Sequence, residues 1–182
     1  MLGSARVKIA VGLALVGLAL TSCSDSSKEG LIIEKYPVNV VHAKGIGSLR
    51  FGDDRGELVD DERVYKGELA CGGLEPYDIP GIAEHADIFF DSEDKFSVVW
   101  IFSPRVTTAE KLTVGSSIDD VRRQYPHAQE LPEVGHSFPG VLVEEGDTGL
   151  LFLYEPQTGE VSKFLAGFVT SLRAVQHGAM DC

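Results

Sequence analysis

Two pairs of strand-like segments, each pair joined by a short polar connection, constrain the fold of this chain most. Residues 86–91 and 95–102 are rich in aromatic and β-branched side chains, and only Ser-Glu-Asp separates them. Residues 149–154 and 160–165 form a similar pair around Glu-Pro-Gln-Thr-Gly. Connections of this length between such segments are typical of β-hairpins. Because no strand–helix–strand rhythm repeats along the chain, we predict an α+β fold built on an antiparallel β-sheet.

Further segments also have the composition of strands. They are residues 31–35, 38–42, 47–51 and 168–175. In the last segment both alternating sets contain apolar residues, so its buried face is ambiguous. Trp100 lies in the most apolar segment of the chain, and we expect it in the core rather than on a sugar-binding surface.

The clearest helix signal covers residues 114–125. Ser116 or Ser117 provides the N-cap, and two aspartates follow in the first turn, where the helix dipole favours them. Pro126 ends the helix. The apolar stripe, spaced i, i+3 and i+7, consists of Ile118, Val121 and Tyr125. A weaker helix is predicted at 53–63, so we expect one or two short helices packed on one face of the sheet.

The two predicted helices follow similar junctions. Residues 49–54 and 111–117 both give a short strand, a glycine and a polar cap before a helix. Gly52 and Gly115 are 63 positions apart, a sensible length for one helix-plus-sheet unit. The shared pattern suggests the hypothesis of a tandem repeat, with the alternative that such junctions arise without common ancestry.

The second junction and its helix, residues 114–126, read Val-Gly-Ser-Ser-Ile-Asp-Asp-Val-Arg-Arg-Gln-Tyr-Pro. This stretch resembles a phrase of small secreted bacterial modules, including the β-lactamase-inhibitor-like and outer-membrane-assembly-lipoprotein-like group. The resemblance implies a short helical piece packed on an antiparallel sheet, and a protein that binds other proteins without catalysis. The first junction departs from the group's pattern, because it lacks the hydroxyl cap and the clear helix.

The N-terminal residues have the three-part layout of a secretory signal. Arg6 and Lys8 precede twelve uncharged, mostly aliphatic residues at 9–20. A membrane-spanning helix needs roughly 20 apolar residues, so this segment is too short to be one. Its end, Leu20-Thr21-Ser22-Cys23, resembles the bacterial lipobox. The resemblance implies cleavage before Cys23 and lipid attachment at Cys23, and the alternative is a plain secretory signal with a chance cysteine.

These features predict three parts: a lipoprotein signal peptide at 1–22, a flexible tether at 23–30 and a single globular domain at 31–182. The tether is polar and low in complexity, a composition that cannot bury enough surface to fold. Removal of 22 residues from 182 leaves 160, which is enough to form a core.

The chain is strongly acidic. It has 16 basic and 28 acidic residues, and loss of the two basic residues of the signal leaves 14 against 28, a net charge of −14. Such a chain is repelled by nucleic acid and by anionic lipid surfaces. The predicted partners are therefore the lipid bilayer, through the Cys23 acyl anchor, and an envelope protein, with no nucleic acid.

Three cysteines are present: Cys23, Cys71 and Cys182. If Cys23 carries lipid, an even number remains in an oxidising compartment, and the expected outcome is a Cys71–Cys182 disulfide. The alternative is a reactive thiol at Cys71 with a nearby histidine.

Motifs for catalysis and metal binding are weak. Residues 135–140 miss the serine-hydrolase elbow by one position, and the five histidines lack the spacing of zinc ligands. The acidic turns at 91–94 and 144–147 match no calcium loop. We therefore predict no catalytic residue, metal or cofactor, and a non-catalytic binding or assembly module anchored at the extracytoplasmic side of a membrane. The alternative is a cell-envelope hydrolase that uses carboxylates or His136 in a cleft.

Overall fold

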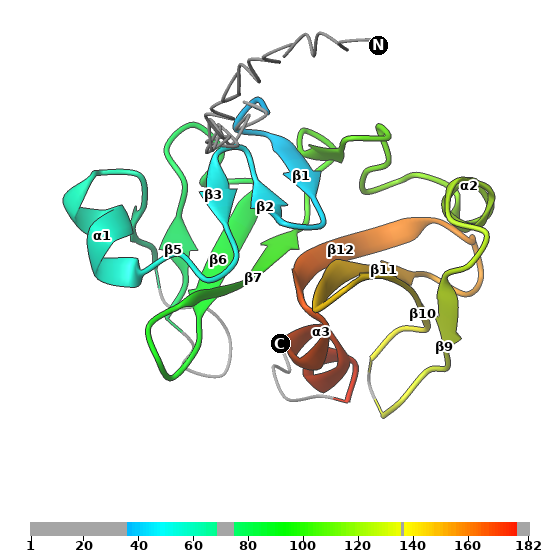
Figure 1. The fold of residues 1–182 in the computed structure, drawn as a ribbon. Coiled ribbons are helices and arrows are strands. Elements are labelled where there is room, and N and C mark those ends of the chain that lie inside the picture. Colours follow the sequence, from blue (N-terminus) through cyan, green and yellow to red (C-terminus); the bar gives the residue numbers. More distant parts are fainter. Residues whose placement is uncertain (1–35, 69–74, 136, 178–182) are drawn as a thin grey trace, which may run out of the picture. The chain divides into compact units, whose positions relative to one another are not determined.

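A long antiparallel sheet dominates the computed structural model, which describes residues 36–68, 75–135 and 137–177 (Figure 1). The strands are β4 (Tyr65–Lys66), β5 (Tyr77–Asp78), β6 (Ala86–Phe90), β7 (Phe96–Ile101), β9 (Gln129–Leu131), β10 (Gly140–Glu145), β11 (Thr148–Tyr154) and β12 (Val161–Phe168). Their order across the sheet is β4-β5-β6-β7-β12-β11-β10-β9. The predicted hairpins are confirmed as the antiparallel pairs β6–β7 and β11–β12.

A smaller sheet lies beside the main one. It contains β1 (Val40–His42), β2 (Gly45–Ile46), β3 (Leu49–Arg50) and β8 (Thr107–Thr108), in the order β3-β2-β1-β8. The pairing of β1 with β8 is parallel and departs from the antiparallel pattern predicted for the chain.

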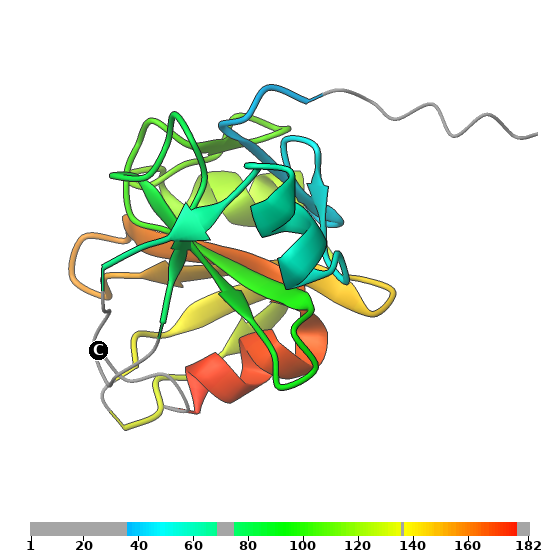
Figure 2. The ribbon, with the colours of Figure 1, turned by 90° about the vertical axis from the view of Figure 1, so that its left-hand side faces the viewer.

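Helices cover both faces of the main sheet. α1 (Arg55–Asp60) and α2 (Ile118–Gln124) bury Leu58, Ile118 and Val121 in a core shared with the smaller sheet. α3 (Val169–Gln176) buries Leu172 and Val175 in a second cluster on the opposite face. Figure 2 shows α1 and α2 above the main sheet and α3 below it. The fold is thus α+β, with the two predicted helices on one face.

The prediction of a strand at 168–175 is wrong, because most of this segment forms α3. Leu172, Val175 and Gln176 are buried, at spacings of three and four residues, as one face of a helix requires. The apolar residues of this segment recur at the spacing of a helix. Odd and even positions therefore both contain apolar residues, and no single face could be assigned from a strand pattern.

The main sheet consists of two four-stranded halves that meet at β7 and β12. In the first half, the Gly52 amide donates to the Phe96 carbonyl at 2.8 Å. In the second half, the Gly115 amide donates to the Val161 carbonyl, also at 2.8 Å. Gly52 and Gly115 have φ angles of 93° and 86°, a left-handed region that favours glycine.

The start of each helix is attached to the same half in the same way. The Arg55 amide donates to the Asp94 carbonyl at 2.9 Å, and the Ile118 amide donates to the Gly159 carbonyl at 2.8 Å. Asp94 and Gly159 both have positive φ, at 60° and 70°. The two halves therefore share strand order and junction hydrogen bonds, as the repeat hypothesis predicts.

Several sequence predictions fall outside the described residues. These are the signal peptide and tether, the strand at 31–35, the lipidation of Cys23 and the disulfide between Cys71 and Cys182. Among the helices of residues 36–68, 75–135 and 137–177, none combines the length and apolarity needed to cross a membrane.

Candidate functional site

A pocket of about 320 Å³ lies between the β2–β3 hairpin, the end of α1 and the connection that follows β5. We call it the hairpin pocket. Its lining residues are Tyr36, Val38, Ile46, Ser48, Leu49, Glu62, Arg63, Ile79 and Pro80. The volume lies at the lower end of the range of small-molecule sites, about 300–1,000 Å³.

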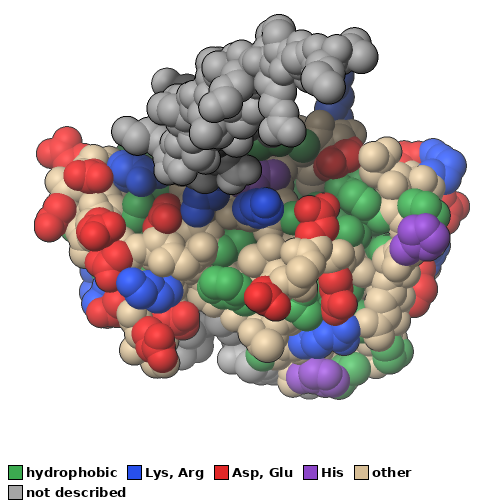
Figure 3. Space-filling view, viewed as in Figure 1, with side chains coloured by type: hydrophobic (Ala, Val, Ile, Leu, Met, Phe, Trp, Pro, Cys, Tyr) green, Lys and Arg blue, Asp and Glu red, His purple; other side chains and the backbone are tan. Residues whose placement is uncertain are grey.

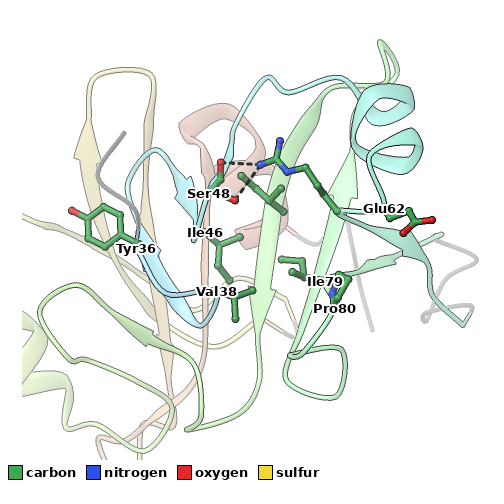
Figure 4. A pocket seen from close by; sticks show the side chains of 9 residues that line it. Tyr36, Val38, Ile46, Ser48, Glu62, Ile79 and Pro80 are labelled. Atoms are coloured by element: carbon green, nitrogen blue, oxygen red, sulfur yellow. Dashed lines mark hydrogen bonds between the residues drawn. The ribbon is translucent and has the colours of Figure 1, made fainter. Parts of the chain in front are cut away.

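The floor of the hairpin pocket is aliphatic. Ile46, Leu49 and Ile79 are almost fully buried, whereas Val38 on the wall is 44% exposed. Figure 4 shows Val38, Ile46, Ile79 and Pro80 gathered at one side of the pocket, with the Glu62 carboxylate directed away from them. An apolar surface in this position can bury an aliphatic group of a ligand.

The C-terminal turn of α1 positions Arg63. The Arg63 amide donates to the Leu58 carbonyl at 2.9 Å, and the Glu62 amide donates to the Val59 carbonyl at 3.0 Å. This pair of bonds is the Schellman motif, with Glu62 at φ 55° in the position that glycine usually occupies. The turn reverses the chain and brings Arg63 back towards the hairpin.

The Arg63 guanidinium bridges α1 to the β2–β3 turn. Its Nη2 donates to the Ser48 carbonyl at 2.9 Å and lies 3.3 Å from the Ser48 hydroxyl, the bonds dashed in Figure 4. No carboxylate of the described residues forms an ion pair with it. Among the described residues, Arg50 and Arg105 likewise lack an ion pair, whereas Arg55, Arg122, Arg123 and Arg173 each have one.

The hairpin beneath this bridge is held by a second arginine. Arg50 Nη1 donates to the Gly47 carbonyl at 3.0 Å and to the Leu49 carbonyl at 3.2 Å, and it lies 3.1 Å from His42 Nε2. The His42 ring stacks on Tyr36, with 4.6 Å between ring centroids. These contacts fix the hairpin that forms one wall of the pocket.

A second pocket, of about 240 Å³, occupies the corresponding position in the other half, between the end of α2 and β10. There the Tyr125 hydroxyl donates to a Glu110 carboxylate oxygen at 2.6 Å. Burial, followed by the hydrogen bond to Glu110, raises the pKa of Tyr125. In both halves, a side chain just past the helix therefore bonds to the turn that precedes the helix.

The second pocket does not gather its two glutamate side chains. Glu144 is ion-paired with Arg173 of α3 at 2.6 Å, on the far face of the sheet. Glu145 is the next residue of β10, and its charge raises the pKa of Tyr125 on the near face. Successive residues of a strand point to opposite faces, which separates the two carboxylates.

The acidic turns of the sequence analysis have structural partners. Asp91 accepts hydrogen bonds from the amides of Glu93 at 2.9 Å and Lys95 at 3.0 Å, and Asp94 pairs with Arg55 at 2.9 Å. Glu144 of the other turn pairs with Arg173, as above. Within the described part of the chain, no group of three or more His, Cys, Asp or Glu could hold a metal ion.

His136, the candidate of the hydrolase alternative, lies outside the described residues.

Sequence reasoning missed the hairpin pocket. The sequence predicts a helix that runs to Arg63, but α1 ends at Asp60, and Arg63 lies past its end at the rim of the pocket. The one feature of the sequence that could have indicated this ending is that the helical pattern is weak after residue 60. The lining residues come from three separate segments, and the sequence does not show that these meet.

Figure 3 shows acidic and basic side chains interspersed over one face of the molecule, and the chain as a whole has a net charge of −12. Within the described residues, Arg63, Arg50 and Arg105 have no carboxylate partner, and of these three only Arg63 lines the hairpin pocket. It provides a place for an anionic group on an otherwise acidic protein.

Comparisons with known proteins give only distant matches. No protein-family model matches the chain, and no curated protein matches it in sequence. It is similar in structure to an extracellular protein containing an SCP domain from Bacillus anthracis, with 15% identity, a TM-score of 0.44, and coverage of 68% of this chain and 45% of the other. A cysteine-rich secretory protein from Staphylococcus aureus gives 13% identity, a TM-score of 0.40, and coverage of 69% and 47%. The chain thus spans less than half the length of each of these two proteins.

Proposed function

We propose that this protein is a lipid-anchored module on the extracytoplasmic side of a membrane, and that it acts by binding rather than by catalysis. The lipobox-like Leu20-Thr21-Ser22-Cys23 supports the anchor and the location. The hairpin pocket supports the binding role and is the proposed binding site.

The chemistry of the pocket lining carries the binding proposal. Its side chains are mainly aliphatic, with the Arg63 guanidinium and the Ser48 hydroxyl at the rim. Such a surface can remove an apolar group from water and hold a polar group in a fixed orientation. An apolar surface and a fixed polar group are enough to bind a ligand. Hydrolysis also needs a nucleophile or a positioned pair of acid and base.

Membrane fractionation tests the anchor. We expect the wild-type full-length chain in the membrane fraction of the producing cells, and the Cys23→Ala variant in the soluble fraction, because its acyl chains are missing. A Cys23→Ala variant that stays with the membrane would contradict the anchor.

Site-specific photo-crosslinking tests the binding site. A photoreactive phenylalanine analogue replaces Val38 in the full-length protein, and Val59 is the matched control, since the two side chains are 44% and 40% exposed. Val59 lies on α1 and does not line the pocket. We expect crosslinked products in cells to be several times more abundant from position 38. Equal yields at both positions would reject the hairpin pocket as the binding site.

A further inference from the structure

We propose that the hairpin pocket binds a short branched aliphatic group that carries an adjacent carboxylate. The inference rests on the proposed binding function and names the chemistry of the ligand. A C-terminal aliphatic residue of a peptide and a free short-chain fatty acid share this chemistry.

The aliphatic part follows from the floor of the pocket. Ile46, Leu49 and Ile79 present hydrocarbon at the base, and Val38 and Pro80 extend it towards solvent. About 320 Å³ holds one branched side chain together with the few backbone atoms beside it, but it is small for a sugar chain or a nucleotide. Because Ile46, Leu49 and Ile79 are only 1–3% exposed, the hydrocarbon that binding removes from water is mainly that of Val38 and of the ligand itself.

The carboxylate follows from Arg63. One of its terminal nitrogens, Nη2, is held by the carbonyl of Ser48 at 2.9 Å, which fixes the guanidinium at the rim. Within the described ranges, its Nε and Nη1 donate no hydrogen bond to another residue and no carboxylate pairs with it. A planar guanidinium with unused donors matches the geometry of a carboxylate.

The charge of the surroundings limits the ligand to a single negative charge. Glu62 lies two residues after the end of α1, next to Arg63 in the chain, and the whole protein carries a net charge of −12. A dianion such as phosphate gains from Arg63 but is repelled by this field, and the aliphatic floor offers it no hydrogen bonds. A cationic ligand is disfavoured because it would meet the guanidinium at the rim.

Titration followed by NMR tests the inference on the mature chain with Cys23→Ser. The probes are N-acetyl-leucine, its amide, 4-methylpentanoate and inorganic phosphate. We expect N-acetyl-leucine or 4-methylpentanoate to shift the methyl signals of Val38, Ile46 and Ile79, with a dissociation constant on the order of 1 mM for a fragment of this size. The amide should bind about tenfold more weakly, because it loses the charge-assisted hydrogen bond to Arg63.

Two variants locate the effect. Arg63→Gln should bind acid and amide equally, whereas Arg63→Lys keeps the charge and should retain part of the preference. Arg123→Gln, on α2 in the other half, is the matched control and should behave as the wild type. Unchanged dispersion of the NMR spectrum shows that a variant is folded, so a lost preference reflects the missing guanidinium.

Each outcome decides the question. Stronger binding of N-acetyl-leucine than of 4-methylpentanoate supports a peptide terminus, and the reverse order supports a free fatty acid. Equal binding of acid and amide by the wild type, or phosphate binding at Arg63, overturns the inference. If no probe shifts the pocket signals while position 38 still crosslinks in cells, the ligand chemistry is wrong and the proposed function stands. If crosslinking also fails, both are rejected.

Discussion

At the scale of single residues, the surroundings of Asp87 disfavour the ionised form of its carboxyl group. It is opposite Trp100 in the register of β6 and β7, so both side chains lie on the face that carries α3. Burial, followed by the charge of Asp78, raises the pKa of Asp87. Burial, followed by the charge of Glu68, also raises the pKa of Asp78. The native state therefore holds these protons to a higher pH than the unfolded chain does.

The sign of the pH dependence follows from this difference. Between the ordinary pKa of 3.8 and the raised value, the folded protein binds more protons than the unfolded chain, so its stability falls as pH rises through this window. We predict that Asp87→Asn raises Tm at pH 7 by on the order of 2 °C. At about pH 3 the gain should vanish, because Asp87 is then protonated in both states. Thermal unfolding at the two pH values measures this, with Glu93→Gln at an exposed turn as the control. A gain of equal size at both pH values would contradict the explanation.

At the scale of elements, local signals were enough where one short segment determines the structure. The cap at Ser117, the aspartates after it and the proline at 126 placed α2 correctly, and the hairpins followed from their connection lengths. The segment that forms α3 has no side-chain cap, since its N-cap is Phe168, and its helical character depends on packing against the sheet. Sequence patterns alone could not distinguish it from a strand.

The cap of α2 gives a prediction at this scale. Ser117 accepts a hydrogen bond from the Asp119 amide at 3.2 Å, and its own backbone forms an isolated bridge with Glu160. Ser117→Ala removes the side-chain bond and keeps the bridge, so we expect a loss of about 1 kcal/mol in the free energy of unfolding. Urea unfolding measures it. Thr170→Ala, at an exposed position in the first turn of α3, is the control and should change stability by less than about 0.5 kcal/mol. A loss at Ser117 no larger than that of the control would exclude capping as the source of stability.

At the scale of the whole molecule, the two halves of the main sheet are alike in strand order and in the placement of their pockets. Each half attaches its helix to the start of its last strand, and each leaves a pocket beyond the end of that helix. The linings differ, because Arg63 meets the hairpin in one half and Tyr125 meets Glu110 in the other. The spacing of the glycines suggested the repeat, but the position of the hairpin pocket depends on β5, which the sequence did not identify as a strand.

The predicted disulfide would add a constraint on this whole arrangement. Cys71 and Cys182 lie outside the described residues, in the segment after β4 and in the six residues that follow α3. In the chain-entropy model, a crosslink that closes so long a loop stabilises the folded state by about 4–5 kcal/mol. We therefore expect reduction, or the Cys71→Ser and Cys182→Ser double variant, to lower the free energy of unfolding by about that amount, whereas Cys23→Ser should leave it unchanged. Peptide mass spectrometry without reduction measures the bond directly. Two free thiols in the mature protein would contradict the pairing, and with it the inference that the domain folds in an oxidising compartment.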